Sequence, residues 1–140
     1  MKNIVLIISF AFACFFKTVQ AQVPDTLAYL QSIVSKKSFY IGKPFSVLRD
    51  SLKIQIKHFW PYSGKSHDIT KETSTQFSFY FPQTTDEMYL TYPSLEIYWQ
   101  PYLNANQSRI LYTNSNRGSW TPTTAAYYAN RIITDIKIFN

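Results

Sequence analysis

Residues 40–61 read YIGKPFSVLRDSLKIQIKHFWP, and local structural signals agree best in this stretch. Gly42 favours a tight turn, and Pro44 suits the first turn of a helix, because a proline lacks the N–H that would have no helical partner there. After this helix, apolar residues fall at every second position, which is typical of a strand with one buried face. The stretch therefore predicts a turn, a short helix over 44–50 and a strand over 51–59.

The segments on either side carry similar signals. Before the quoted stretch, residues 24–37 place apolar side chains at helical spacing behind Asp25, a candidate helix cap. After it, a loop is expected over 60–71, and residues 83–92 give no clear pattern. The further expected elements are strands over 75–81, 94–102 (bounded by Pro93 and Pro101), 108–113 and 131–139, a turn over 114–119, and a helix over 121–129 capped by Thr121.

These elements indicate one domain over residues 22–140, since no repeat or linker interrupts them. The expected fold class is α+β, with a single antiparallel or mixed sheet of about five strands and two to three helices packed on one face. The other face of the sheet would meet solvent. By alternation, it would carry Lys53, Gln55, Lys57, Ser78, Tyr80, Glu96, Tyr98 and Gln100.

The first 21 residues have the pattern of an export signal. A basic start at Lys2 is followed by an apolar run over 4–16, and the small residue Ala21 suits cleavage before Gln22. The run is shorter than the roughly 20 apolar residues of a membrane-spanning helix. The alternative is a lipoprotein acylated at Cys14, which bulky Phe12 just upstream disfavours. The expected location is therefore periplasmic or secreted, with no transmembrane anchor after cleavage.

Composition limits the chemistry of the predicted mature chain. The chain's only cysteine would leave with the signal, which excludes disulfides, thiolate nucleophiles and cysteine metal ligands. Loss of Lys2 and Lys17 would reduce 14 basic residues to 12 against 8 acidic ones, a net charge of +4. These charges are dispersed, so nucleic acid is not an expected partner, whereas anionic surfaces or glycans are compatible with them.

Two segments carry a resemblance to a known family. The motifs GKPFSVL…LKIQIK and SLEIYWQPYL resemble those of small exported bacterial proteins of unknown function. The resemblance would cover most of residues 22–140. It implies a secreted α+β domain and supplies no catalytic residues.

Several motifs were weighed as catalytic or metal sites. Residues 63–66 (SGKS) end like a phosphate-binding loop but lack its first glycine, so they indicate a turn. His58, His67 and Asp68 could hold a metal or form a hydrolase site, but their spacing fits neither, and His58 is expected to be a half-buried core residue. The sequence therefore predicts no metal and no cofactor.

Paired carboxylates, the usual signature of glycoside cleavage, give little support either. Asp86 and Glu87 are neighbours that would diverge in a strand. Glu96 and Asp135 could face each other only if their strands were adjacent. Solvated surface charge is the preferred interpretation.

What remains is the abundance of aromatic residues, which include 11 tyrosines and 3 tryptophans. Such rings can stack on sugars or anchor a protein partner. The expected function is that of an exported, non-enzymatic module that binds a protein or a glycan through the open sheet face and the loop after Trp60. The alternatives are a small hydrolase using His67 and Asp68, or an assembly or stress protein. The candidate ligand-binding residues are Trp60, Tyr62, His67, Tyr80, Tyr98, Tyr102 and Trp120.

Overall fold

The computed structural model describes residues 25–64, 68–84, 87 and 92–140. The predicted export signal over 1–21, with Cys14, and the candidate residue His67 lie outside the described residues. Among those that are described, no helix has the length and apolar character to cross a bilayer.

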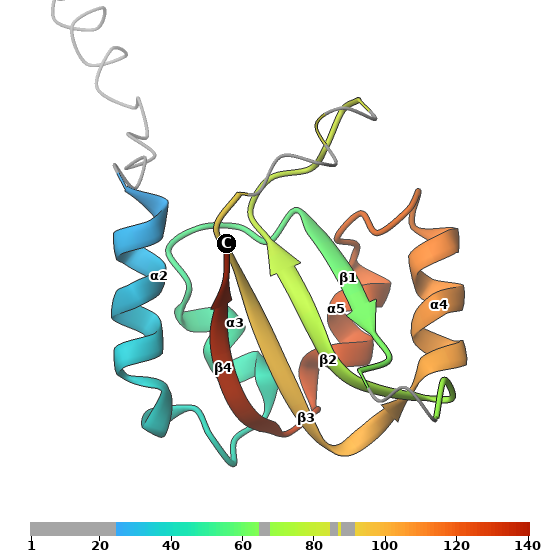
Figure 1. The fold of residues 1–140 in the computed structure, drawn as a ribbon, viewed down its shortest axis with the longest axis horizontal. Helices are drawn as coiled ribbons and strands as arrows, with labels where there is room; N and C mark the ends of the chain where they lie inside the picture. The colour runs from blue at the N-terminus through green and yellow to red at the C-terminus, as the bar shows by residue number, and fades with distance from the viewer. Residues whose placement is uncertain (1–24, 65–67, 85–86, 88–91) are drawn as a thin grey trace, which may run out of the picture.

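The sheet is antiparallel throughout and its strands follow the order of the chain (Figure 1). The strands are β1 (His58–Tyr62), β2 (Lys71–Ser78), β3 (Ser94–Asn104) and β4 (Ile133–Phe139). The expected α+β class with a single sheet is confirmed. The described part of the chain has four strands in this sheet rather than about five.

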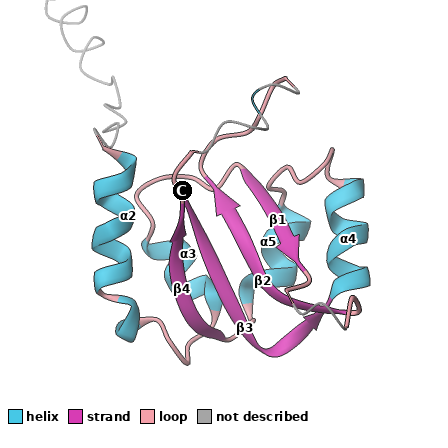
Figure 2. Ribbon diagram, in the orientation of Figure 1, coloured by secondary structure: helices cyan, strands magenta, loops and turns pink. Residues whose placement is uncertain are grey.

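In the described part of the chain, four α-helices rather than the expected two to three accompany the sheet: α2 (Thr26–Ser35), α3 (Phe45–Ser51), α4 (Ala105–Asn114) and α5 (Pro122–Ala129). A short 3-10 turn, η1 (Lys37–Phe39), follows α2. In Figure 2, α3 and α5 lie behind the strands, α2 flanks β4, α4 flanks β1, and no helix lies in front. One face of the sheet is therefore left open by the helices, as the sequence predicts.

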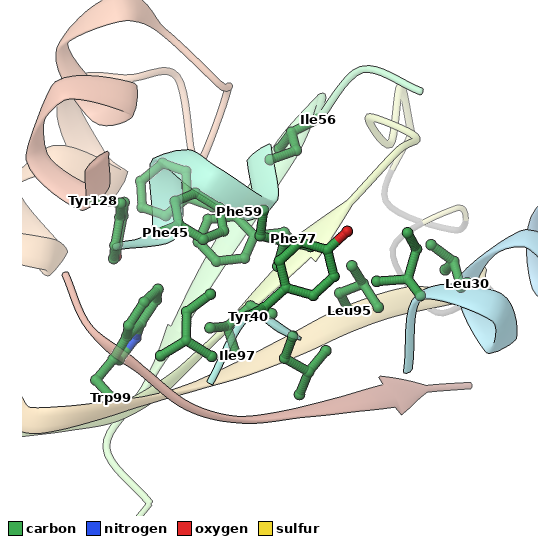
Figure 3. Close-up of a cluster of buried hydrophobic side chains, with 14 of the residues drawn as sticks. Leu30, Tyr40, Phe45, Ile56, Phe59, Phe77, Leu95, Ile97, Trp99 and Tyr128 are labelled. Atoms are coloured by element: carbon green, nitrogen blue, oxygen red, sulfur yellow. The ribbon is translucent and has the colours of Figure 1, made fainter. Parts of the chain in front are cut away.

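The core lies between the sheet and the helices and is built largely from aromatic rings (Figure 3). Phe45 of α3 stacks on Phe77 of β2 with ring centroids 4.6 Å apart. Trp99 of β3 stacks on Tyr128 of α5 at 5.6 Å. Such offset and edge-on pairs add to the stabilisation that burial of their area supplies.

Two helices begin where their caps predict. The Asp25 carboxylate accepts the backbone N–H of Ala28 at the start of α2, and the Thr121 hydroxyl accepts that of Thr124 at the start of α5. Each cap satisfies a backbone donor that has no partner within its helix. Gly42, at φ +78°, forms the expected turn before α3.

The strand predicted over 51–59 is wrong for most of its length. Only its last two residues belong to β1, and residues 52–57 are irregular. Burial does alternate there, because Leu52 and Ile54 pack against the core and Ile56 is buried. An extended chain with one buried side gives this pattern without any partner strand. Lys53, Gln55 and Lys57 therefore lie outside the sheet face on which they were expected.

The strand predicted over 108–113 is also wrong, because this segment lies in α4. The Asn104 side chain accepts the N–H groups of Asn106 and Gln107 and so starts the helix. The buried residues Ala105 and Ser108 and the half-buried Tyr112 are three and four positions apart, which is helical spacing. This cap and the packing of the helix override the strand preference of Ile110 and Tyr112.

Strand ends differ from expectation at three places. Residues 60–62 belong to β1 rather than to a loop. β2 begins at Lys71 and ends at Ser78, so Tyr80 lies beyond the strand. β3 continues through Pro101, which follows a cis peptide bond, as far as Asn104.

Candidate functional site

The open face of the sheet carries a hydrogen-bonded cluster centred on Glu96 of β3. Its Oε1 accepts from the Ser74 hydroxyl at 2.8 Å and its Oε2 from the Tyr98 hydroxyl at 2.9 Å. The Lys137 ammonium lies 4.5 Å from the centre of the Tyr98 ring. Burial and the bond to Glu96 both raise the pKa of Tyr98. The Tyr98 ring is therefore held in a fixed position by neighbours on three strands.

A second chain of hydrogen bonds runs across the same face. The Tyr62 hydroxyl donates to the Gln76 amide oxygen at 2.8 Å, and the Gln76 amide nitrogen donates to Ser94 Oγ at 2.7 Å. Burial raises the pKa of Tyr62, and the charge of Glu96 adds to this shift. The face is thus a polar platform whose side chains orient one another.

A hollow of about 540 Å³ opens beside this platform where β3 passes Pro101. We call it the β3 hollow. It contains two of the predicted site residues, Tyr98 and Tyr102, together with Trp99 of the core edge. Its lining consists of Gly64, Thr73, Tyr98, Trp99, Gln100, Pro101, Tyr102 and Thr134.

The polar groups of the described residues that line the β3 hollow are all uncharged. Gln100 and Tyr102 are exposed, and the Thr73 hydroxyl accepts the backbone N–H of Gly64 at 2.9 Å. An amide, hydroxyls and aromatic faces can donate, accept and stack, but they supply no countercharge. The β3 hollow therefore suits a neutral polar ligand.

The other predicted aromatic residues are dispersed. Trp60 packs edge-on against Tyr112, at 5.1 Å, in a separate hollow of about 210 Å³ that Arg109 also lines. Tyr62 lies on the open face but outside the β3 hollow. Trp120 packs against Phe77 of the core, with ring centroids 5.5 Å apart.

Tyr80 lies in the connection after β2. Its ring is tilted against that of Tyr92, with ring centroids 4.5 Å apart, and its hydroxyl donates to Glu87 at 2.6 Å. This hydrogen bond raises the pKa of Tyr80 to about 12. Tyr80 is therefore engaged within its own connection and not in the β3 hollow.

Of the residues weighed for hydrolysis or metal binding, His67 lies outside the described residues, and Asp68 and His58 have other partners. Asp68 accepts from Thr70, which lowers the pKa of Asp68 to about 2, and it pairs with Lys71 at 3.0 Å. His58 is buried, as expected, with Nε2 3.1 Å from the Arg117 carbonyl oxygen, and burial lowers its pKa. Within the described ranges, no three His, Cys, Asp or Glu side chains gather as metal ligands.

Glu96 and Asp135 do lie on adjacent strands, but each has partners of its own. Glu96 is opposite Lys137 in the register, and Asp135 is opposite Tyr98. Asp135 forms an ion pair with Lys37 at 2.6 Å. Burial acts to raise the pKa of Asp135, yet its bond to Lys37 and its backbone bond bring that pKa below the ordinary value. The two carboxylates are thus held by separate partners.

The most unusual polar group of the molecule was not foreseen from the sequence. Glu72 of β2 is fully buried beneath α4 and α5, where it accepts hydrogen bonds from Thr75, Ser108 and Tyr128. Thr75 in turn accepts the Trp99 indole N–H at 2.8 Å. Burial raises the pKa of Glu72, and its hydroxyl partners only partly oppose this shift.

Both carboxyl oxygens of Glu72 accept hydrogen bonds from hydroxyl groups. Its Oε1 accepts from Thr75 and Tyr128, and its Oε2 accepts from Ser108. The buried carboxyl group is therefore fully hydrogen-bonded, as a buried polar group requires.

The comparisons with known proteins give no relative for this arrangement. No family model, no curated protein and no solved structure matches the chain. A functional proposal for this protein therefore has to be argued from its own residues.

Sequence reasoning found part of the site and missed part. Alternation in β3 placed Tyr98 on the open face, and β-strand composition made Tyr102 a candidate. The β3 hollow itself depends on strand pairing and on Gly64, which no local pattern places. Glu72 sits in a run of polar residues, KETST, where its burial has no signal in the sequence.

Proposed function

We propose that this protein is an exported, non-enzymatic module that binds a neutral glycan in the β3 hollow. The observation that carries the proposal is the meeting of two tyrosine rings with uncharged polar groups in one hollow of about 540 Å³. That volume falls within the roughly 300–1,000 Å³ of typical ligand pockets.

The chemistry of sugars fits this lining. A pyranose ring presents an apolar C–H face on one side and hydroxyl groups around its rim. Tyrosine rings such as Tyr98 and Tyr102 supply flat apolar surface together with a polar hydroxyl. Gln100 and Thr134 lie beside them and can bond sugar hydroxyls. The absence of charge in the described lining favours neutral sugars over uronic or sialic acids.

The hydrogen bonds of the nearby Glu96 carboxylate support binding without catalysis. Both Glu96 oxygens accept hydrogen bonds from protein hydroxyls, which leaves this group committed to the platform. A glycosidase would need two carboxyl groups placed about 5–9.5 Å apart across the scissile bond. The lining of the β3 hollow contains no carboxylate.

Export is the other half of the proposal, and it rests on the sequence pattern of residues 1–21. The mass of the protein recovered from outside the cytoplasm tests it. A chain that begins at Gln22 supports export with cleavage at Ala21, an acylated chain that begins at Cys14 supports export as a lipoprotein instead, and an uncleaved chain that begins at Met1 contradicts the proposal.

Titration calorimetry with neutral disaccharides, namely cellobiose, chitobiose and maltose, tests glycan binding. We expect Tyr102→Ala to weaken binding by about tenfold, because loss of one stacked ring removes roughly 1 kcal/mol or more. Gln100→Ala should weaken it less. Tyr92→Ala is the matched control, since Tyr92 is 43% exposed, like Tyr102 at 44%, and lies outside the hollow.

Two results would contradict the proposal. One is no heat of binding for any of the three disaccharides at millimolar concentration. The other is equal weakening by Tyr102→Ala and Tyr92→Ala, which would place the ligand elsewhere. A protein captured only by the wild type, without any sugar binding, would favour the alternative of a protein partner.

A further inference from the structure

The segment that joins α2 to α3, residues 36–47, projects apolar side chains into solvent. We call it the Phe39 loop. Phe39 is 59% exposed and Ile41 is 39% exposed. Val47, on the first turn of α3, is 37% exposed. Three large apolar side chains within nine residues are more than the scattered exposure of an ordinary surface.

The loop is held in this shape and cannot fold its apolar side chains inward. The residue between the two exposed ones, Tyr40, is buried, and its hydroxyl lies 3.0 Å from Ser51 Oγ. The backbone of Gly42 donates to the Ile133 carbonyl at 2.8 Å, and Ile133 donates back to Lys43 at 3.1 Å. Because Tyr40 is anchored inward, its neighbours on either side are directed outward.

The charged residues within the Phe39 loop itself are all basic. Residues 36–47 contain Lys36, Lys37 and Lys43 and no acidic residue. The Lys43 ammonium lies 3.4 Å from the centre of the Phe39 ring. Lys37 is neutralised by its ion pair with Asp135. Lys36 and Lys43 therefore remain to face an outside partner together with the Phe39 ring.

We propose that the Phe39 loop docks the protein on an anionic phospholipid bilayer. A bilayer surface offers what this loop complements: negative phosphates for the lysines, and an apolar layer just below for Phe39 and Ile41. On contact, a lipid phosphate takes the Lys43 ammonium and the Phe39 ring enters the boundary between headgroups and acyl chains. Because only a few side chains contact the bilayer, the attachment is peripheral and reversible.

The Phe39 loop shares no residue with the described lining of the β3 hollow. In Figure 1 the loop runs below α2 and in front of no strand, whereas the open face of the sheet looks toward the viewer. The lipid contact and glycan binding therefore use different surfaces, and either can exist without the other.

Co-sedimentation of the mature chain with vesicles tests this inference. We use vesicles of phosphatidylcholine containing about one third phosphatidylglycerol, and vesicles of phosphatidylcholine alone. The wild type should bind the anionic vesicles at least about tenfold more strongly, and added salt should weaken that binding, since exposed charges are screened.

Two variants separate the apolar from the charged contribution. Phe39→Ser with Ile41→Ser, and Lys36→Glu with Lys43→Glu, should each lower binding to anionic vesicles by about tenfold or more. Ile110→Ser is the matched control, because Ile110 on α4 is 59% exposed, as Phe39 is, and it should bind like the wild type. Circular dichroism verifies that each variant is folded.

The inference is overturned if neutral and anionic vesicles sediment the wild type equally, or if neither does. It is also overturned if Ile110→Ser loses as much binding as the Phe39 and Ile41 variant. Tyr102→Ala, which removes the proposed glycan contact, should leave vesicle binding unchanged, so that failure of one proposal is distinguishable from failure of the other.

Discussion

Glu72 is a fully buried carboxyl group that forms no ion pair among the described residues. Its partners are hydroxyl groups from β2, α4 and α5, and a charged carboxylate there loses its hydration without gaining a paired opposite charge. This burial raises the pKa of Glu72. The residue links the sheet to two helices through its hydrogen bonds.

This gives stability a pH dependence whose sign can be worked out. The pKa of Glu72 is raised in the folded chain, so the folded state binds the proton more tightly than the unfolded state does. The resulting stabilisation is fully present below the unfolded pKa of about 4.3 and is lost as pH rises through the folded pKa, by roughly 1.4 kcal/mol per pH unit. Urea unfolding at a series of pH values measures it.

Two substitutions of Glu72 should have different effects on the free energy of unfolding. Glu72→Gln keeps an amide in place of the neutral carboxyl, so this part of the pH dependence should vanish and stability near neutral pH should be kept or raised. Glu72→Ala leaves buried hydroxyl groups without their acceptor and should lower the free energy of unfolding by about 2–5 kcal/mol. A Glu72→Gln variant with the slope of the wild type would show that another group titrates.

At the level of elements, α4 shows how a cap overrides local preference. Its residues Ile110 and Tyr112 favour strands, yet Asn104 accepts two N–H groups of the first turn and begins a helix. Asn104→Ala should therefore lower the free energy of unfolding by about 1 kcal/mol.

A matched substitution two residues later makes this prediction sharper. Asn106 lies inside the first turn of α4, where alanine is the better helix former, so Asn106→Ala should leave stability unchanged or raise it slightly. Thermal unfolding of both variants measures the difference. Equal destabilisation by the two would contradict the capping role of Asn104.

The difference between local signals and contacts distant in sequence explains how much of the fold could be predicted. Helices α2 and α5 were predicted because Asp25 and Thr121 are local signals that agree with the packing. Residues 52–57 were misassigned because alternating burial reports a buried side and not a hydrogen-bonded partner. Of the candidate site, Tyr98 followed from alternation, whereas the hollow and Glu72 arise from contacts distant in sequence.

For the whole molecule, β4 is the element that completes the fold. Ile136 and Ile138 of β4 lie opposite Ile97 and Leu95 of β3, and α2 packs beside the same strand. A chain that ends at residue 132 should therefore show no cooperative unfolding transition in urea. Removal of Asn140 alone is the control, since this residue follows β4. A cooperative transition in the shorter chain would contradict this dependence.

The ion pair between Lys37 and Asp135 joins the C-terminal end of the first described helix region to the last strand. During synthesis, α2 is made well before β4, the strand beside which it packs. This packing has to wait until residues 133–139 have been made, and contacts between such distant segments form slowly. If residues 1–21 direct export, translocation of an unfolded chain can begin before any stable domain has formed that would have to be undone.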